Sequence, residues 1–248
     1  MIHTDQPYLL VAHPGHELLL HGWIAAAKPV VHVVTDGSRQ ARLDATAALL
    51  RDAGARPGTI FGRLSDQEAY AMILERNTAL LFSIVTELAA AIEAERPAMI
   101  VSDAAEGYNP VHDLCRLIAG AAVASAGAGT QHYEYAVVES PDLPDADIVF
   151  ELDDAAYAAK IESARRHAAM LPDVDDMLSQ HGAEAYRVER FRRVLDWTEI
   201  SDAPALYEHF GEERVAAHRY TRVIRRAEHI VPLRDALCAA VEKRACAF

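Results

Sequence analysis

Short apolar segments alternate with longer amphipathic segments along the first 140 residues of the chain. The apolar segments have the length of buried strands, and the amphipathic segments have helical spacing. We expect strands at 8–12, 30–35, 59–61, 98–102 and 133–138, and helices at 17–27, 42–53, 67–95 and 111–126. Strands that alternate with helices form right-handed βαβ units. The pattern therefore predicts a Rossmann-like, three-layer α/β/α fold with a mostly parallel sheet.

The pattern changes after residue 146. A short strand at 148–150 precedes a helix at 155–169, which Pro172 and the acidic residues that follow it are expected to end. Residues 204–244 have the spacing of one or two long amphipathic helices, with a break at Pro232. We therefore predict a domain of residues 1–200 and a helical C-terminal extension of residues 201–248 packed on it. A contact between copies in a homo-oligomer is the second explanation of the extension's apolar face.

Composition narrows the class of protein. The chain has 248 residues, 51% of them hydrophobic, which is enough for one sizeable core. Its formal net charge is −13 without a dense Lys/Arg run, so nucleic acid is not an expected partner. Cys115, Cys238 and Cys246 are too scattered for a disulfide scaffold, and we expect Cys115 in the core. The sequence has no signal-peptide pattern and no apolar run of about 18 residues, so we expect a cytoplasmic protein without a membrane span.

Two histidines lie at the turn between the first predicted strand and the first predicted helix, in the sequence Ala-His-Pro-Gly-His-Glu at 12–17. In open α/β sheets, ligand-binding groups collect at the carboxyl ends of the strands. His13 and His16 can close on one metal ion, because each neutral ring offers a lone pair. The alternative is that both are solvent-exposed loop side chains. His32 lies inside the second predicted strand, and we expect it to be a hydrogen-bonded core residue, not a metal ligand.

The other predicted strands also end in polar residues. Asp36 and Arg39 follow the second strand, Asp66 follows the third, and a polar loop at 103–112 follows the fourth. His112 ends that loop at the start of a helix. With the two histidines of the first turn, it would make a catalytic zinc site whose open position holds a water with a pKa of about 7. By itself, His112 is equally well explained as a surface residue at a helix N-terminus.

These positions resemble the motifs of the zinc-dependent LmbE-like de-N-acetylases, the family of the N-acetylglucosaminyl-phosphatidylinositol de-N-acetylase (PIG-L). The family's Ala-His-Pro-Asp-Asp-Glu motif is similar to 12–17, and its His-Pro-Asp-His motif is similar to Tyr-Asn-Pro-Val-His at 108–112. Its Thr-x-Gly and Leu-Pro-Asp-Gly segments are similar to Thr-Asp-Gly at 35–37 and Leu-Ser-Asp-Gln at 64–67. Order and spacing agree over residues 8–195, and the chain after about 204 lies outside the resemblance.

The resemblance implies that His13, His16 and His112 bind zinc, with His16 in the place of an aspartate. It also implies that the family's general base, the first Asp of the motif, is replaced by Gly15, which has no side chain for this role. The loss of a positioned base typically costs about 10²–10⁴-fold in rate.

Other residues of the same rim also receive roles. Replacement bases are Glu106, Asp103 and Asp36, whereas we expect Glu17 to orient a metal ligand. The resemblance implies that Tyr108 and Asn109, which stands where the family has a histidine, assist at the oxyanion. Arg39 and Asp66 would hold sugar hydroxyls.

The sequence therefore predicts a zinc-dependent hydrolase that removes an N-acyl group, acetyl first, from an amino sugar or its conjugate, a small-molecule substrate. Two alternatives stay open. Three neutral nitrogens also suit Fe²⁺ or another transition metal, with different chemistry. The changes at Gly15 and Asn109 also fit a catalytically silent paralogue that serves as a binding or scaffold module.

Overall fold

The computed structural model describes residues 6–246, with the exception of 140, 144, 167 and 202. Within that part of the chain, seven strands form one sheet in the order β3-β2-β1-β4-β5-β7-β6. The strands are β1 (Tyr8–Val11), β2 (Val30–Thr35), β3 (Arg56–Leu64), β4 (Met99–Asp103), β5 (Gln131–Tyr135), β6 (Ile148–Glu151) and β7 (Val188–Arg193). Strands β1 to β5 are parallel, and β7 pairs antiparallel with both β5 and β6. The predicted mostly parallel α/β architecture is confirmed.

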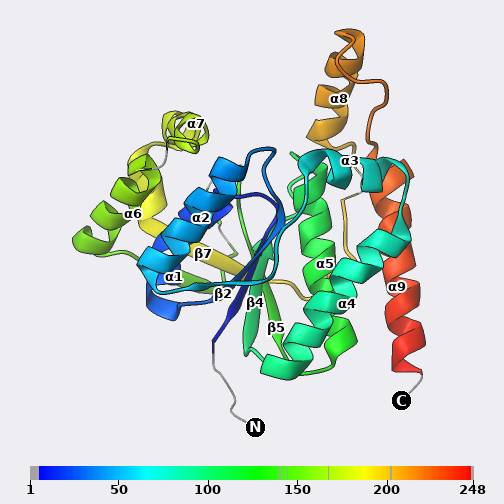
Figure 1. Cartoon of the computed structure of the whole chain (residues 1–248), viewed down its shortest axis with the longest axis horizontal. Coiled ribbons are helices and arrows are strands. Elements are labelled where there is room, and N and C mark those ends of the chain that lie inside the picture. Colours follow the sequence, from blue (N-terminus) through cyan, green and yellow to red (C-terminus); the bar gives the residue numbers. More distant parts are fainter. Residues whose placement is uncertain (1–5, 140, 144, 167, 202, 247–248) are drawn as a thin grey trace.

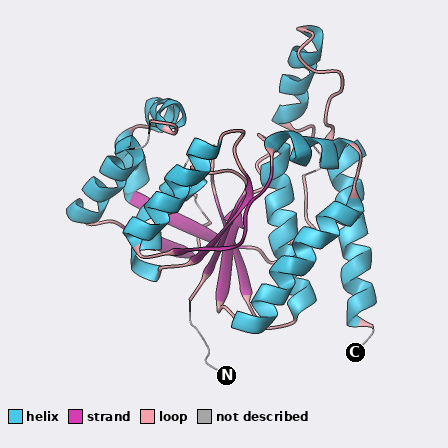
Figure 2. Ribbon diagram, viewed as in Figure 1, coloured by secondary structure: helices cyan, strands magenta, loops and turns pink. Residues whose placement is uncertain are grey.

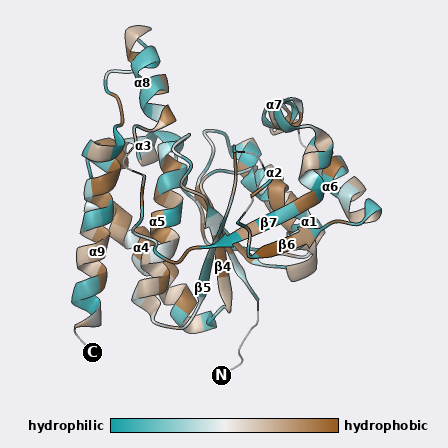
Figure 3. Cartoon of the chain, turned by 180° about the vertical axis from the view of Figure 1, so that it is seen from behind, coloured by the Kyte–Doolittle hydropathy of each residue, from teal (hydrophilic) through white to brown (hydrophobic). Residues whose placement is uncertain are grey.

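Helices cover both faces of the sheet (Figure 1, Figure 2). They are α1 (His21–Ala27), α2 (Gln40–Ala53), α3 (Asp66–Leu74), α4 (Thr78–Glu95), α5 (Pro110–Ala126), α6 (Asp154–Arg166), α7 (Leu171–His181), α8 (Leu206–Ala216) and α9 (Val231–Ala245). Helices α1, α2 and α6 lie on one side of the sheet, and α4, α5 and α9 lie on the other. The same arrangement from behind shows α9 alongside α4 and α5 and α8 projecting past the layer (Figure 3).

Alternation along the strands decides which residue faces which helix layer, because successive side chains of a strand point to opposite faces. Leu10 and Val34 pack in the cluster that holds α4, α5 and α9. Val11 and Val33 pack in the cluster that holds α1 and α2. Both faces of these strands are therefore buried, which explains why their sequences are almost continuously apolar.

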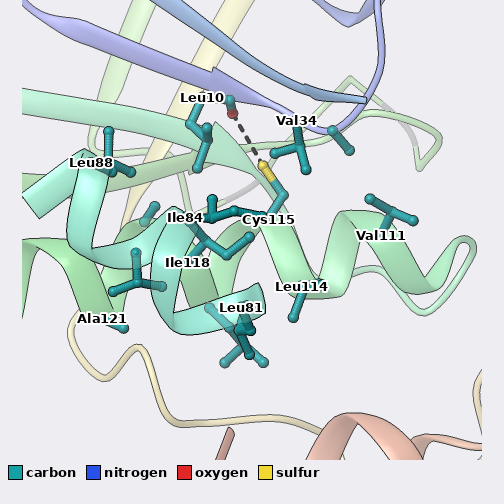
Figure 4. Packing of buried hydrophobic residues seen from close by; sticks show 14 of the residues in the cluster. Leu10, Val34, Leu81, Ile84, Leu88, Val111, Leu114, Cys115, Ile118 and Ala121 are labelled. Carbon is teal, nitrogen blue, oxygen red and sulfur yellow. Dashed lines mark hydrogen bonds between the residues drawn. The ribbon is translucent and has the colours of Figure 1, made fainter. Parts of the chain in front are cut away.

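Cys115 is a buried core residue, as predicted, and its thiol lies 3.4 Å from the carbonyl oxygen of Leu10 (Figure 4). His32 is also buried, and its Nδ1 accepts a hydrogen bond from the Ile60 amide at 3.4 Å. His229 is buried as well. Its Nδ1 lies 2.9 Å from the Arg225 amide nitrogen, so the ring closes the turn that begins the last helical segment.

The helix expected at 67–95 is two helices, α3 and α4. The chain takes a positive φ of 50° at Arg76, and the Asn77 side chain then caps α4 by accepting a hydrogen bond from the Leu80 amide at 3.1 Å. Such a cap is worth about 1 kcal/mol, which favours a new helix start over continuation. At the other end, Ser65 and Glu68 form a capping box that starts α3 immediately after β3.

Two further expectations about the second half of the chain are wrong. Pro172 does not interrupt a helix but lies in the first turn of α7, where its missing N–H costs nothing. Pro232 has the same place in α9, and the break lies earlier, between α8 and a π-helical turn at Arg226–Ile230. No helix in the described ranges has both the length and the apolar character to cross a bilayer.

Candidate metal centre

The turn after β1 has a backbone that only glycine adopts easily. Gly15 has a φ of 110°, and a 3₁₀ turn (His16–Leu20) follows it. The buried Glu17 braces this turn, because its carboxylate accepts the Gly15 amide at 2.7 Å and the Thr46 hydroxyl at 2.6 Å. Glu17 therefore holds the turn that carries His13 and His16, which is a different task from the expected one of orienting a ring.

Three imidazole rings meet above the carboxyl ends of β1 and β4. The ring centroids of His13 and His16 are 5.3 Å apart, those of His13 and His112 are 5.5 Å apart, and those of His16 and His112 are 4.7 Å apart. Three rings on one tetrahedral zinc, each with a Zn–N distance near 2.1 Å, would have centroids about 5 Å apart. The structure brings the three predicted histidines to this separation from two distant turns.

The ring of His13 is held through its Nδ1, which lies 2.8 Å from Thr35 Oγ1 and 3.1 Å from Asp66 Oδ1. With its Nδ1 proton directed at these oxygens, the lone pair resides on Nε2. That Nε2 is buried and has no hydrogen-bond partner among the described residues. Asp66 also accepts the Ser38 hydroxyl at 2.6 Å. Burial opposes ionisation of Asp66, but the bond to His13 outweighs it and lowers the pKa of this carboxyl.

Asp103, the last residue of β4, holds His16 in the same way. Its Oδ2 lies 2.8 Å from His16 Nδ1 and accepts the Ala12 amide at 2.8 Å, and its Oδ1 accepts the Tyr135 hydroxyl at 2.8 Å. Burial alone would raise the pKa of Asp103, but the adjacent His16 lowers it to about 2. Burial likewise opposes the charged form of His16, whose pKa Asp103 raises. The carboxylate thus stays ionised behind the ring.

His112 lies in the first turn of α5, whose N-terminus Asn109 caps by accepting the Val111 amide at 2.9 Å. The side chain is only 3% exposed, and its Nδ1 has no hydrogen-bond partner in the part of the chain that the structure describes. Burial, and then the neighbouring His16, keep the pKa of His112 well below its usual value. A neutral ring with an unsatisfied nitrogen is the state in which histidine binds a metal.

The donor set fits a divalent transition metal. His16, Asp103 and His112 each offer a donor atom, and these atoms lie within 4.8 Å of one another, a set that does not include His13. The Asp103 carboxylate already accepts three hydrogen bonds, whereas His13 Nε2 and His112 Nδ1 are buried without a partner. Buried polar atoms without a partner are costly, and a metal ion would satisfy them. The carboxylate–histidine pairs match the arrangement that usually supports metal-binding histidines.

The remaining predicted residues are divided between the site and its surroundings. Tyr108 and Asn109 line the cavity next to the three histidines. Glu106 is 2% exposed, lies 4.0 Å from His112 Nδ1, and accepts backbone amides of residues 137–139. Burial raises the pKa of Glu106 to about 7. Asp36 and Arg39 are not among the residues that line the cavity, where Arg42 lies instead.

The cavity in front of the histidines has a volume of about 370 Å³ and one strongly apolar wall. Helices α6 and α7, the residue before α7 and the turn after β1 supply that wall, which is formed by Leu18, Ile161, Met170, Val174, Met177 and Leu178. Met170 fills the space beside Gly15, where a Cβ atom would lie 3.2 Å from its sulfur. Arg42 pairs with Asp173 across the rim and donates a hydrogen bond to the Pro14 carbonyl at 3.0 Å.

Sequence reasoning missed the supporting roles of Asp66, Asp103 and Thr35. The signal available for Thr35 and Asp103 was their position at the carboxyl ends of β2 and β4, the strands beside β1, and for Asp66 its position after β3, one strand further out. The apolar wall from α6 and α7 had no signal in the motifs, because these helices join the site only through tertiary packing.

The comparisons with known proteins agree at the level of the fold. No protein-family model and no curated protein sequence matches the chain. The solved structure of the A40926 pseudoaglycone deacetylase Dbv21 superposes with a TM-score of 0.59 at 17% sequence identity, and covers 79% of this chain and 99% of its own. The chain has the fold of this deacetylase. A deacetylase of the teicoplanin biosynthesis pathway, solved as a complex with bog, superposes with a TM-score of 0.52 at 14% sequence identity. That match covers 76% of this chain and 99% of the deacetylase chain.

These likenesses confirm the predicted resemblance to the LmbE-like deacetylases as one of fold. The sequence identities are low, so the residues of the site carry the functional argument.

Proposed function

We propose that this protein is a metal-dependent hydrolase that removes an N-acyl group, acetyl first, from an amino sugar or its conjugate. The observation that carries the proposal is the convergence of His13, His16 and His112, two of them held from behind by carboxylates. The deacetylase fold supports the same class of reaction. Cytoplasmic localisation of this reaction stays a prediction.

In this proposal the three histidines hold a zinc ion, or Fe²⁺ in its place, which supplies a nucleophile at neutral pH and polarises the acyl carbonyl. Asp66 and Asp103 keep the Nδ1 protons of His13 and His16 in place, so that each Nε2 is ready to bind without rearrangement. This preorganisation lowers the cost of forming the site.

The cavity walls give the substrate two different environments. The apolar side chains of α6 and α7 suit the acyl group and the apolar face of a sugar ring, since they exclude water from the amide. Asn109 uses its side-chain oxygen to cap α5 and directs its NH₂ group at the Tyr70 hydroxyl. The Tyr108 hydroxyl would stabilise an oxyanion, and the Asn109 NH₂ group would join it by leaving Tyr70.

Proton transfer is the step in which this chain departs from the family pattern. The nearby carboxylates are already engaged: Asp103 and Asp66 with histidines, and Glu106 with three backbone amides. Of the bases considered, Glu106 is the one whose pKa, about 7, suits proton exchange at neutral pH, and its Oε2 lies 4.0 Å from His112 Nδ1. We assign Glu106 the role of proton acceptor in place of the family's base.

Release of a free amine tests the proposal. The zinc-, Fe²⁺- and Co²⁺-loaded proteins are incubated with N-acetylglucosamine and its methyl glycoside, and amine and acetate are both measured. We expect metal-dependent release that His112→Ala abolishes and that His209→Ala, a change of an exposed histidine on α8, leaves intact. No amine release with any of the three metals would remove the proposed activity.

A silent binding module is the second candidate. The absence of a side chain at Gly15 and the engagement of the neighbouring carboxylates favour it. It predicts metal and sugar binding without amine release, which the same assay and a binding measurement separate from the first proposal.

A further inference from the structure

A second groove opens directly beside the metal centre, with a volume of about 700 Å³. Asp66, Tyr108 and Asn109 line both this groove and the cavity of the histidines, so the two spaces adjoin. Helix α3 and the loop before α5 form one wall. Helix α8 and residues 217–224, in the projecting part of the molecule, form the other (Figure 1).

The far wall of this groove is positively charged in a chain whose formal net charge is −13. Arg214, Arg219 and Arg222 line it. Arg222 pairs with Glu75, but among the described residues neither Arg214 nor Arg219 has a carboxylate partner at ion-pair distance. Arg214 instead donates a hydrogen bond to the Tyr220 hydroxyl at 2.7 Å.

The acidic groups around these arginines contact other polar side chains. Asp66, the acidic residue that lines the groove, is engaged with His13 and Ser38. On α8 itself, Glu212 pairs with Arg225 at 2.8 Å, and Glu213 lies 3.3 Å from His209. Arg214 and Arg219 are therefore cations available to an anionic ligand.

Aromatic rings flank the same arginines. Tyr108 and Tyr220 are 41% and 42% exposed, so part of each ring is open to solvent in the groove. The Tyr108 ring packs edge-on against Phe210 of α8, with centroids 5.7 Å apart. Rings beside guanidinium groups suit a sugar or other flat group that carries a phosphate or carboxylate, because the guanidinium fork pairs with either anion in a bidentate way.

We propose that this groove holds an anionic group, a phosphate or a carboxylate, on the part of the substrate that leaves as the amine. The inference rests on the proposed function for the reaction, and on the groove's own residues for the binding. With the amide at the histidines, Tyr108 and Asn109 mark the boundary, and the rest of the substrate extends toward Arg214 and Arg219. These arginines belong to the C-terminal part of the chain, which the sequence motifs do not reach.

Binding calorimetry on the full chain tests the proposal with three sugars: N-acetylglucosamine 1-phosphate, N-acetylmuramic acid and the neutral methyl N-acetylglucosaminide. Inorganic phosphate is titrated separately, so anion binding is measured even if no sugar binds. The test variant is Arg214→Gln/Arg219→Gln, two exposed positions, and the matched control is Arg51→Gln, an exposed arginine on α2. Thermal unfolding checks that all three proteins are folded.

We expect wild type and Arg51→Gln to bind at least one anionic probe at least tenfold more tightly than the double variant does, since hydrogen bonds to charged groups are lost. The probe that shows the effect distinguishes phosphate from carboxylate. Equal affinities of wild type and double variant for inorganic phosphate and both anionic sugars overturn the proposal. Amine release is measured independently, so its absence beside arginine-dependent binding contradicts the proposed function alone.

Discussion

At the scale of single residues, the metal centre depends on which nitrogen of each ring carries the lone pair. Asp66 and Asp103 decide this for His13 and His16, because a carboxylate at Nδ1 leaves Nε2 unprotonated. Asp103 also accepts the Ala12 amide and the Tyr135 hydroxyl, which ties the turn after β1 to the ends of β4 and β5.

Asp103→Asn should weaken metal binding by about 10–100-fold, the usual cost of losing such a partner. The amide keeps the size of the carboxylate, but it is neutral and directs an NH₂ group at groups that donate hydrogen bonds. Zinc affinity is measured by competition with a chelator. Asp36→Asn, at a partly exposed aspartate outside the cavity, is the control and should bind zinc as wild type does. Unchanged affinity in Asp103→Asn would contradict the orienting role.

Gly15→Ala should destabilise the fold by about 1–3 kcal/mol, because a side chain is strained at a φ of 110° and its Cβ would meet Met170. The control is Gly127→Ala, where φ is also positive, at 59°, but a Cβ would meet no atom within 4 Å. Urea unfolding measures both. A smaller loss at Gly15 than at Gly127 would show that this turn does not need glycine. The same strain argues that Gly15→Asp would not simply restore a base.

The sequence predicted the three histidines because strand ends in a parallel sheet share one edge. It could not assign Asp66 and Asp103 as their partners. That assignment depends on the strand order β3-β2-β1-β4, and on which carboxylate comes within 3.1 Å of which ring. Arg39 is the first arginine after the second strand, but Arg42, one helical turn later, lines the cavity.

At the scale of elements, hydrophobic periodicity located strands and helices well and their interruptions poorly. The helices α3 and α4 share one apolar pattern, so their separation at Arg76 and Asn77 depends on a cap that periodicity does not measure. The helix breaks predicted at two prolines were wrong for a related reason. At Pro172 and Pro232 it starts a helix, and only the neighbouring backbone distinguishes a start from a break.

Helix α9 contributes to the main core, which gives a test of its packing. Leu237 is 1% exposed in the cluster that α4 and α5 share, so Leu237→Ala should cost about 2–5 kcal/mol of unfolding free energy. Leu195→Ala removes the same atoms from a leucine that is 87% exposed. This control should change the unfolding free energy by less than about 0.5 kcal/mol. Equal effects of the two substitutions in urea unfolding would mean that α9 is not part of the core in solution.

At the scale of the whole molecule, the C-terminal segment is tied to the helix that carries His112. The buried Arg226 lies 3.2 Å from Asp113, the residue after His112, and donates to the carbonyls of Ser201 and Ala203 at 3.2 and 3.0 Å. The division into a domain and an extension remains our proposal. The anion-binding groove that this segment would form was beyond sequence reasoning, because its two walls lie about 100 residues or more apart in the chain.

The pH dependence of stability contains a contribution from His132, which is buried beside Ser102. Burial, and then Arg116, lower its pKa to about 3 in the folded protein, whereas the unfolded value is near 6.5. The unfolded state therefore binds the proton first, and stability is full above pH 6.5 and falls as the pH drops toward 3. Between pH 7 and pH 5, this histidine should lower the free energy of unfolding of wild type by roughly 2 kcal/mol. His132→Gln should remove that part of the loss, and urea unfolding at both pH values measures it. Parallel curves for the two proteins would contradict this.

The most direct test of the account is equilibrium zinc binding to the full chain, with the metal counted per molecule. A three-histidine site predicts one tightly bound equivalent in wild type and in His209→Ala, and none retained in His13→Ala or His112→Ala, although both variants remain folded. No bound zinc in wild type, or binding that survives removal of either ring, would contradict it.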